Sequence, residues 1–221
     1  MKNTIVVIGA SGHAKVVMDI IELEGKYRIA GLIDTYKPAG GLLFGYEILG
    51  AEETLAKLVS SGEVDGGIIT IGDNWVRHLM AEKIRSLLPD FNFIRTVHPS
   101  ASVARGVTIG GGSVLMAGVV VNSESKVGEF CVLNSNASLD HDSVMEDFSS
   151  LAPNATTGGN VSIGAFSAVS MGANILHGLN IGKHSVVGAG AVVLDDVPEF
   201  CVAYGVPARV ISKRHAGDKY L

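Results

Sequence analysis

An imidazole between two carboxylates is the feature of this 221-residue sequence that most clearly suggests chemistry. The segment reads Asp140-His141-Asp142. Histidine titrates near neutrality and a neighbouring carboxylate can fix its tautomer, so His141 could take the proton that an amine or hydroxyl loses on attacking a thioester. Adjacency in sequence does not choose between Asp140 and Asp142 as the orienting acid. A solvent-exposed wall histidine is the alternative interpretation.

A second candidate site lies near the start of the chain, at the turn Gly9-Ala10-Ser11-Gly12-His13. The turn separates a β-rich segment from a helical one, and backbone N–H groups at a helix N-terminus favour phosphate. Ser11, Gly12 and His13 are therefore candidate nucleotide ligands, although the turn is shorter than the full dinucleotide signature. Asp34 ends the next predicted strand, where it could accept hydrogen bonds from a base or ribose.

The elements that must position these residues follow two patterns, and the first is an alternation of strands and helices. Strands are predicted over 4–9, 28–33 and 66–71, and helices after the glycine turn and over 51–60 and 75–88. The last helix has an apolar face formed by Val76, Leu79, Met80 and Ile84. The alternation predicts a Rossmann-like α/β domain over residues 1–93.

The second pattern is a six-residue repeat that begins at Val97. Sixteen of the seventeen positions spaced six residues apart from Val97 to Val193 are apolar, Thr157 being the exception, and a small residue usually follows four places later. Such a repeat predicts a solenoid of identical coils. The glycines that follow the repeat aliphatic are expected to provide the unusual φ of tight corners; they are Gly110, Gly128, Gly158, Gly164, Gly182 and Gly188.

The repeats resemble the hexapeptide-repeat family, whose chain winds as a left-handed parallel β-helix with three hexads per coil. The resemblance implies such a β-helix over residues 97–197. Gly205-Val206-Pro207-Ala208-Arg209 is similar to the tail that closes many of these helices beside CoA. Residues 198–221 are thus expected to form a closing tail, with Arg209 near the CoA phosphates.

Finer motifs resemble the PglD-type sugar N-acetyltransferases and the related NeuD-type acyltransferases over nearly the whole chain. The spacing from Asn134 to His141-Asp142, the glycine turn and the segment Ile71–Asn74 carry the resemblance. It implies that His141 is the general base, Asp142 its orienting acid and Asn134 a contact to the acceptor sugar.

The same resemblance implies two contacts to the acyl donor. Gly159 lies one coil beyond His141, where its N–H could bind the oxyanion of a tetrahedral intermediate; the alternative is a simple corner glycine. These enzymes often carry a second histidine nine residues after the first. This chain has Ser150 there, whose hydroxyl could contact the acetyl group.

The function implied is acetyl-CoA-dependent N-acetylation of a nucleotide-linked 4-amino-4,6-dideoxy sugar, with UDP favoured and held through Ser11, Gly12, His13 and Asp34. Homotrimers with active sites between subunits are implied as well. O-acetylation of a sialic-acid-type sugar and a non-catalytic β-helix scaffold are the alternatives. The residues leave open the choice among UDP, GDP and dTDP, the sugar, the acyl length and the pathway.

Other classes of function are disfavoured by composition. A net charge of -5 gives no general attraction for nucleic acid, and no apolar stretch is long enough for a membrane helix. The two cysteines, Cys131 and Cys201, fit a reducing cytoplasm and a packing role. No metal is expected, because Gly182 stands where a γ-class carbonic anhydrase pattern would place a histidine after His177; His184 lies two residues too late.

Overall fold

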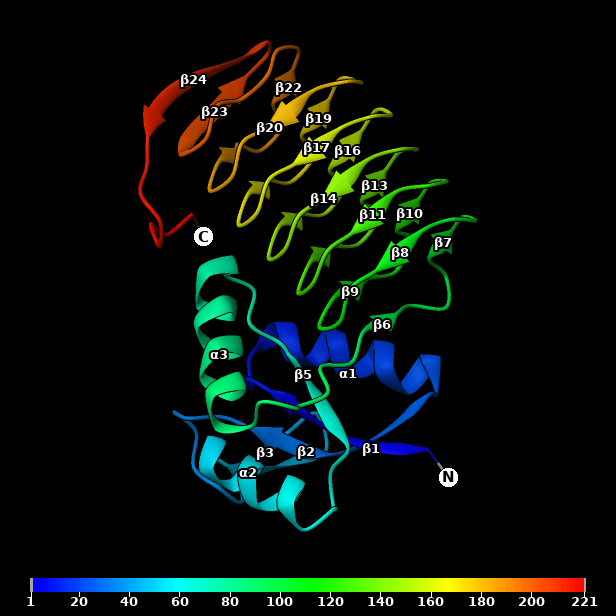
Figure 1. Cartoon of the computed structure of the whole chain (residues 1–221), viewed down its shortest axis with the longest axis vertical. Helices are drawn as coiled ribbons and strands as arrows, with labels where there is room; N and C mark the ends of the chain where they lie inside the picture. The colour runs from blue at the N-terminus through cyan, green and yellow to red at the C-terminus, as the bar shows by residue number, and fades with distance from the viewer. Residues whose placement is uncertain (1, 221) are drawn as a thin grey trace.

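The computed structural model describes residues 2–220, which form an α/β domain followed by a column of β-coils (Figure 1). The α/β domain holds a five-stranded sheet of order β3-β4-β2-β1-β5, parallel except for the β3–β4 pair. Its strands are β1 (Asn3–Ile8), β2 (Tyr27–Ile33), β3 (Leu42–Leu43), β4 (Tyr46–Gly50) and β5 (Gly66–Ile69). Its helices are α1 (Gly12–Glu24), α2 (Glu52–Ser60) and α3 (Asn74–Leu87).

The predicted strands and helices of this domain are confirmed to within about two residues, but the β3–β4 hairpin was not predicted. Its two-residue turn places Phe44 at φ 53° and Gly45 at φ 85°, the conformation that a tight hairpin requires. Phenylalanine is not a typical residue for such a turn, so the sequence carries little signal for it.

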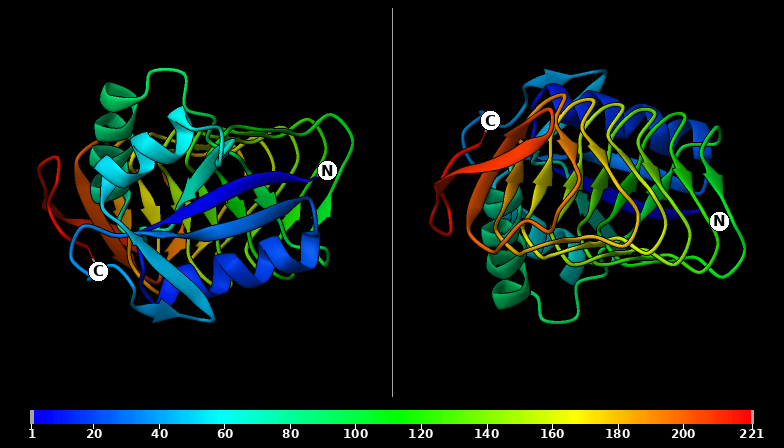
Figure 2. Two further views of the ribbon diagram at one scale, coloured as in Figure 1. Left: turned by 90° about the horizontal axis from the view of Figure 1, so that it is seen from below. Right: turned by 90° about the horizontal axis from the view of Figure 1, so that it is seen from above.

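Both faces of the sheet are covered, which explains its continuous apolar strands. Helix α1 packs against the first coil strand β6 (Thr96–Val97), and the buried side chains of α1, the sheet and the coil interior form one cluster. On the opposite face of the sheet, residues of α2 and α3 form a second buried cluster with the strands. Figure 2 shows the sheet across the end of the coils, with α1 on one side and α2 and α3 on the other.

The β-helix has three parallel walls, built from seventeen two-residue strands within the described chain. Each strand is the residue at the repeat position, aliphatic except for Thr157, and the residue before it, so the predicted register is confirmed. One wall contains β6, β9 (Val114–Leu115), β12 (Val132–Leu133), β15 (Ser150–Leu151), β18 (Ala168–Val169) and β21 (Val186–Val187), then β23 (Cys201–Gly205) and β24 (Ala208–Lys213). The second contains β7 (Ser102–Val103), β10 (Val120–Val121), β13 (Ser138–Leu139), β16 (Thr156–Thr157), β19 (Asn174–Ile175) and β22 (Val192–Val193). The third contains β8 (Thr108–Ile109), β11 (Lys126–Val127), β14 (Val144–Met145), β17 (Ser162–Ile163) and β20 (Asn180–Ile181).

The prediction for the six glycines was wrong, because none of them has a positive φ. The left-handed conformation instead occurs three residues after the repeat aliphatic, for example at Asp142 and Asn160. The six glycines are required by the neighbouring coil: a Cβ on Gly164 would lie 2.5 Å from the backbone nitrogen of Lys183, and one on Gly110 would lie 2.5 Å from the carbonyl of Gly128.

An aromatic ladder occupies one corner of the β-helix. Its rings stack with centroid separations of 4.5–5.4 Å; they belong to Phe130, Phe148, Phe166, His184 and Phe200. Helix α3 packs on this ladder through Trp75 and His78. The two-domain arrangement is thereby held at a fixed orientation, with the N-terminus of α3 beside the first wall.

The apolar face predicted for α3 was partly wrong: Val76 and Leu79 are 47% and 51% exposed, whereas Arg77 is fully buried. The Arg77 guanidinium donates to the carbonyls of Phe130 (2.9 Å), Ile71 (2.8 Å) and Gly72 (2.9 Å). At this point α3 meets the carbonyl of Phe130 from the β-helix corner and those of Ile71 and Gly72 from the segment before the helix. A guanidinium satisfies these acceptors where a valine or leucine cannot.

Candidate active site

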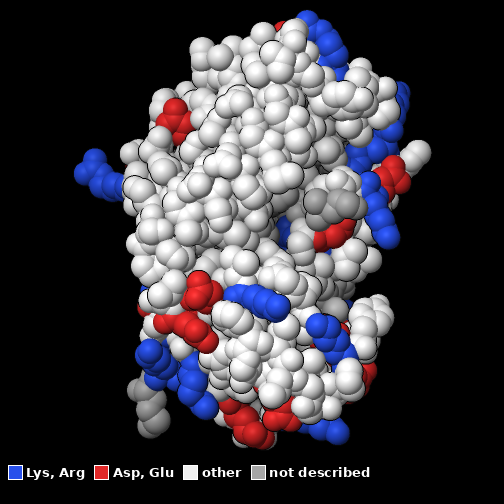
Figure 3. All heavy atoms as spheres, turned by 180° about the vertical axis from the view of Figure 1, so that it is seen from behind, with Lys and Arg blue, Asp and Glu red and all other residues white. Residues whose placement is uncertain are grey.

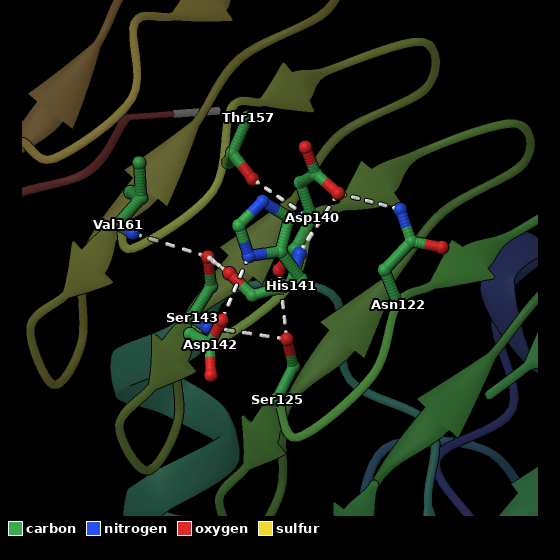
Figure 4. Close-up of polar contacts among 8 residues, drawn as sticks. All are labelled: Asn122, Ser125, Asp140, His141, Asp142, Ser143, Thr157 and Val161. Atoms are coloured by element: carbon green, nitrogen blue, oxygen red, sulfur yellow. Dashed lines mark hydrogen bonds and ion pairs between the residues drawn. The ribbon is translucent and has the colours of Figure 1, made fainter. Parts of the chain in front are cut away.

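His141 lies at the corner between β13 and β14, with its side chain 53% exposed (Figure 4). Its Nδ1 is 2.7 Å from Oδ2 of Asp142. The left-handed backbone of Asp142, φ 55°, directs the carboxylate back toward the preceding ring. Asp140 has a different task, because its Oδ1 accepts from the backbone N–H of His141 at 2.8 Å and from Nδ2 of Asn122 at 2.6 Å. The geometry therefore distinguishes the two acids that the sequence left equivalent.

Both carboxylates affect the protonation of the imidazole. The hydrogen bond to Asp142, followed by the charge of Asp140, raises the pKa of His141 above 6.5. The Asn122 hydrogen bond in turn lowers the pKa of Asp140, which keeps it ionised. A carboxylate on Nδ1 holds that nitrogen protonated and leaves Nε2 as the basic nitrogen. The His141–Asp142 pair can therefore accept a proton at Nε2 of His141.

Gly159 lies against the free edge of this ring, one coil above it. A Cβ at Gly159 would be 2.5 Å from both Cε1 and Nε2 of His141, so only glycine leaves room for the imidazole. The carbonyl of Gly159 accepts from the N–H of Gly178, and within residues 2–220 its own N–H donates to no other group. A backbone N–H that is free to donate, on a residue in contact with the base, suits the oxygen of a tetrahedral intermediate.

Among the cavities that adjoin the α/β domain, two are lined by predicted site residues. The first, here called the turn cavity, has a volume of about 360 Å³, and Ser11, Asp34 and Gly72 are among its lining residues. The Asp34 carboxylate accepts from the backbone N–H groups of Ala10 (2.7 Å), Tyr36 (2.9 Å) and Lys37 (3.0 Å). Asp34 thus braces the two loops at the mouth of the cavity, a role that the sequence did not reveal. Gly12 is the first residue of α1, with no atoms near the position of a Cβ.

His13 does not line the turn cavity with Ser11 and Asp34. Its ring borders a second cavity of about 420 Å³, here called the wall cavity, together with Asn134 and Ser150 on the first wall. Burial, and then the charge of Arg77, lowers the pKa of His13 to about 4, so the ring is neutral at physiological pH. The grouping predicted for the glycine turn is therefore corrected: the helix directs His13 away from the turn and toward the β-helix.

The wall cavity brings Asn134 and Ser150 together, because they follow one another on the first wall at nearly one coil of separation. Asn134 donates from Nδ2 to the carbonyl of Leu151 at 3.1 Å. Ser150 accepts at Oγ from Nδ2 of Asn74 at 3.2 Å. Asn74 and Tyr220 are residues of this region that were not assigned a role from sequence; Asn74 belongs to the noted Ile71–Asn74 segment, whereas nothing in the sequence marks Tyr220.

The structure does not bring Asn134 and His141 together within one chain. Asn134 follows a strand of the first wall and His141 follows a strand of the second, so the two residues lie at different corners of the prism, and His141 borders neither cavity. Arg209 is exposed, with Nη1 3.5 Å from Oδ2 of Asp195.

The remaining expectations concern metal binding, the cysteines and a membrane-spanning helix. Within the described part of the chain no group of three His, Cys, Asp or Glu side chains is placed to hold a metal; His184 stacks in the aromatic ladder and His177 is exposed. Cys131 is fully buried, and burial raises the pKa of its thiol to about 11. None of the helices within residues 2–220 could span a membrane.

Comparison with known proteins places this geometry in a family. Residues 4–84 match the PglD N-terminal domain model. A UDP-N-acetylbacillosamine N-acetyltransferase of Bacillus subtilis is 33% identical over 118 residues, 53% of this chain and 52% of that protein, so the match spans about half of each.

Solved structures match over nearly the whole chain. A mutant of perosamine N-acetyltransferase from Caulobacter crescentus, in complex with CoA and GDP-perosamine, superposes with a TM-score of 0.89 at 32% identity, covering 96% of this chain and 98% of that one. The acetyltransferase domain of PglB from Neisseria gonorrhoeae, in complex with acetyl coenzyme A, gives a TM-score of 0.86 at 30% identity, covering 96% and 100%. With its Rossmann-like domain, left-handed parallel β-helix and His141–Asp142 pair, the chain belongs to the PglD-type family of nucleotide-amino-sugar N-acetyltransferases.

Proposed function

We propose that the protein transfers the acetyl group of acetyl-CoA to the amine of a nucleotide-linked 4-amino-4,6-dideoxy sugar. The observation that carries the proposal is the His141–Asp142 pair, with a 2.7 Å contact at Nδ1 and with Nε2 against Gly159. Relatives with the same fold are named for N-acetylation of amino sugars, which supports an amine rather than a hydroxyl as the acceptor.

The proposed mechanism is direct transfer. The neutral amine attacks the thioester carbonyl while Nε2 of His141 takes its proton, and Asp142 stabilises the imidazolium that forms. The N–H of Gly159 donates to the oxygen of the tetrahedral intermediate. The intermediate then breaks its carbon–sulfur bond, and the thiolate of CoA leaves and is protonated by His141. The amide product forms without a covalent enzyme intermediate.

We propose that the nucleotide of the acceptor occupies the turn cavity. Its lining includes Gly9, Ala10 and Ser11, the turn that leads into α1, and the N-terminus of a helix suits a diphosphate. Asp34 holds the loops on either side. UDP is the nucleotide we infer, with support from the name of the Bacillus subtilis relative; GDP, as in the Caulobacter crescentus complex, is the competing choice.

We infer that the sugar and the thioester meet in the wall cavity, where Asn134 contacts the sugar and Ser150 the acetyl group. Near the C-terminal end of the first wall, a further cavity of about 520 Å³ is bordered by Lys213, Lys219 and Arg214. These cations suit the phosphates of CoA, and they support a donor that runs along the first wall. Arg209 would add charge from its exposed position on β24.

We propose a homotrimer whose active sites lie between subunits. The separation of His141 from Asn134 supports this arrangement, because a neighbouring chain would supply the base to the wall cavity. Three large apolar side chains are exposed on the second wall or at the corner before it: Met171 (61%), Leu176 (47%) and Leu194 (45%). Figure 3 shows a broad face of the β-helix almost free of charged side chains. Exposed uncharged surface of this extent is typical of an interface.

In this proposal residues 1–93 bind the nucleotide sugar, residues 97–197 perform acetyl transfer and residues 198–221 close the β-helix. The cytoplasm is the proposed compartment, because the two cysteines remain as buried free thiols, as expected in reducing surroundings.

The test is an acceptor panel with acetyl-CoA: UDP-, GDP- and dTDP-linked 4-amino-4,6-dideoxy sugars, each beside its 4-hydroxy analogue. Mass spectrometry of the product should show an added acetyl group on one amino sugar and none on its hydroxy counterpart. Acetylation of the hydroxy analogue alone would refute N-acetylation in favour of O-acetylation. Absence of transfer to every acceptor, in a protein that binds CoA, would refute the proposed function.

A further inference from the structure

The C-terminal segment returns from the end of the β-helix to the start of α3. After β24 the chain turns at His215, whose N–H donates to Oδ2 of Asp218 at 2.7 Å. Arg214 hydrogen bonds to the carbonyl of Asp218 and so fixes the same turn. Gly217 lies directly against Trp75 of α3, where a Cβ would be 3.0 Å from Nε1. The turn is therefore docked on α3, and the residues after it are directed at the wall cavity.

This segment places Tyr220 at the wall cavity. Its hydroxyl accepts from the backbone N–H of Asn74 at 3.1 Å, while the side chain of Asn74 donates to Ser150 at 3.2 Å. One residue at the start of α3 thus holds both hydroxyl groups at the same end of the wall cavity. The Arg214 guanidinium carbon lies 5.6 Å from the centre of the Tyr220 ring, which is within the range of a cation–π contact. Burial raises the pKa of Tyr220, so its hydroxyl stays protonated.

The volume of the wall cavity depends on small side chains on one side and on large ones on the other. The outward positions of the first wall carry Ala152, Ala168 and Ser170, which leave the space open. Tyr220 is the largest side chain that borders this space from the opposite, non-coil side. Tyr220 also borders the cavity of Lys213 and Lys219, so it stands between the proposed sites of the acyl group and of the CoA phosphates.

We propose that Tyr220 determines the acyl specificity of the enzyme, by closing the wall cavity beside Ser150 so that acetyl fits and longer acyl groups do not. The inference rests on the proposed function, in which Ser150 contacts the acetyl group. Tyr220 acts by occupying volume; its hydroxyl only anchors the ring on Asn74.

The test compares acetyl-CoA, propionyl-CoA and butyryl-CoA with the wild type, Tyr220→Ala and Tyr220→Phe, at a fixed concentration of the acceptor identified with the panel. Because one methylene in an apolar pocket changes kcat/KM by about tenfold or more, Tyr220→Ala should raise the ratio of kcat/KM for butyryl-CoA to that for acetyl-CoA by at least about tenfold. Tyr220→Phe keeps the ring volume and should leave this ratio within about twofold of wild type.

A ratio unchanged in Tyr220→Ala, with the wild type active, would overturn the inference and leave the proposed function intact. A wild type that transfers no acyl group to any acceptor would overturn the proposed function, and this inference with it. Tyr220→Ala could lower stability, but the ratio compares two donors on one protein, so a smaller folded fraction does not alter it.

Discussion

Gly159→Ala is the substitution whose effect can be worked out most fully from the structure. The added Cβ would lie 2.5 Å from Cε1 and Nε2 of His141, whereas ordinary contact begins at 3.4 Å. Gly159 does not have a positive φ, so its backbone accepts alanine without strain. The clash is therefore relieved by the half-exposed imidazole, which must move by about 0.9 Å.

That displacement acts on the base rather than on the fold. A shift of about 1 Å in a catalytic group costs on the order of 10²-fold in rate, and the shift also disturbs the 2.7 Å contact from Nδ1 to Asp142. We expect kcat to fall about 10²-fold, while the melting temperature and the KM for the nucleotide sugar stay close to wild type.

The assay is thiol release from acetyl-CoA, with thermal unfolding measured in parallel. The matched control is His141→Asn, alone and combined with Gly159→Ala. If Gly159 acts through the ring and the oxyanion beside it, the two losses should be far from additive. Wild-type kcat in Gly159→Ala, or fully additive losses in the double variant, would refute the placement of His141 against Gly159 as the catalytic geometry.

Three further predictions follow from other contacts. The neutral imidazole of His141 is the active form, and Asp142 and then Asp140 raise its pKa, so activity should fall as the pH drops through a value above 6.5. Asp140→Asn should move this acid limb of the pH profile to lower pH. An acid limb that does not move would contradict the assignment of His141 as the titrating base. Arg77→Met leaves the carbonyls of Phe130, Ile71 and Gly72 unpaired and should lower the free energy of unfolding in urea by at least about 3 kcal/mol. A loss below about 1 kcal/mol, the size expected for the control Arg85→Met on the partly exposed face of the same helix, would contradict the role given to Arg77. Leu176→Asp should shift the sedimenting species from trimer to monomer and abolish turnover, unlike Leu23→Asp on α1, and an active monomer would refute an active site shared between subunits.

The sequence predicted the features that depend on short-range pattern. The hexad register set every two-residue strand of the β-helix, because a side chain that must fill the interior recurs at the same place in each coil. Apart from the β3–β4 hairpin, the strands and helices of the α/β domain followed from apolar periodicity in the same way. His141 and its two acids were found because they are adjacent in sequence.

The features that were missed depend on what packs against them. Val76 and Leu79 were assigned to the buried face of α3 because they are apolar, but the buried position is occupied by Arg77, whose guanidinium is needed by the backbone carbonyls around it. The orientation of His13 toward the β-helix, and the return of Tyr220 to the wall cavity, arise from contacts between segments more than 100 residues apart. No local pattern encodes such contacts.

The choice between Asp140 and Asp142 as the orienting acid also depends on contacts that the local sequence does not reveal. Both acids flank the imidazole in sequence, and only the left-handed conformation of Asp142 and the hydrogen bond from Asn122 to Asp140 distinguish them. Asn122 is 18 residues from Asp140, one coil below it. The stacking of coils therefore selects the acid that orients the base.

The most direct test of the central claim is the rate of thiol release from acetyl-CoA with a nucleotide-linked 4-amino sugar, measured side by side for the wild type and His141→Ala. We expect turnover by the wild type, a fall of about 10² or more in kcat for the variant, and equal affinity of both proteins for CoA. Equal turnover by the two proteins would contradict the assignment of His141 as the general base.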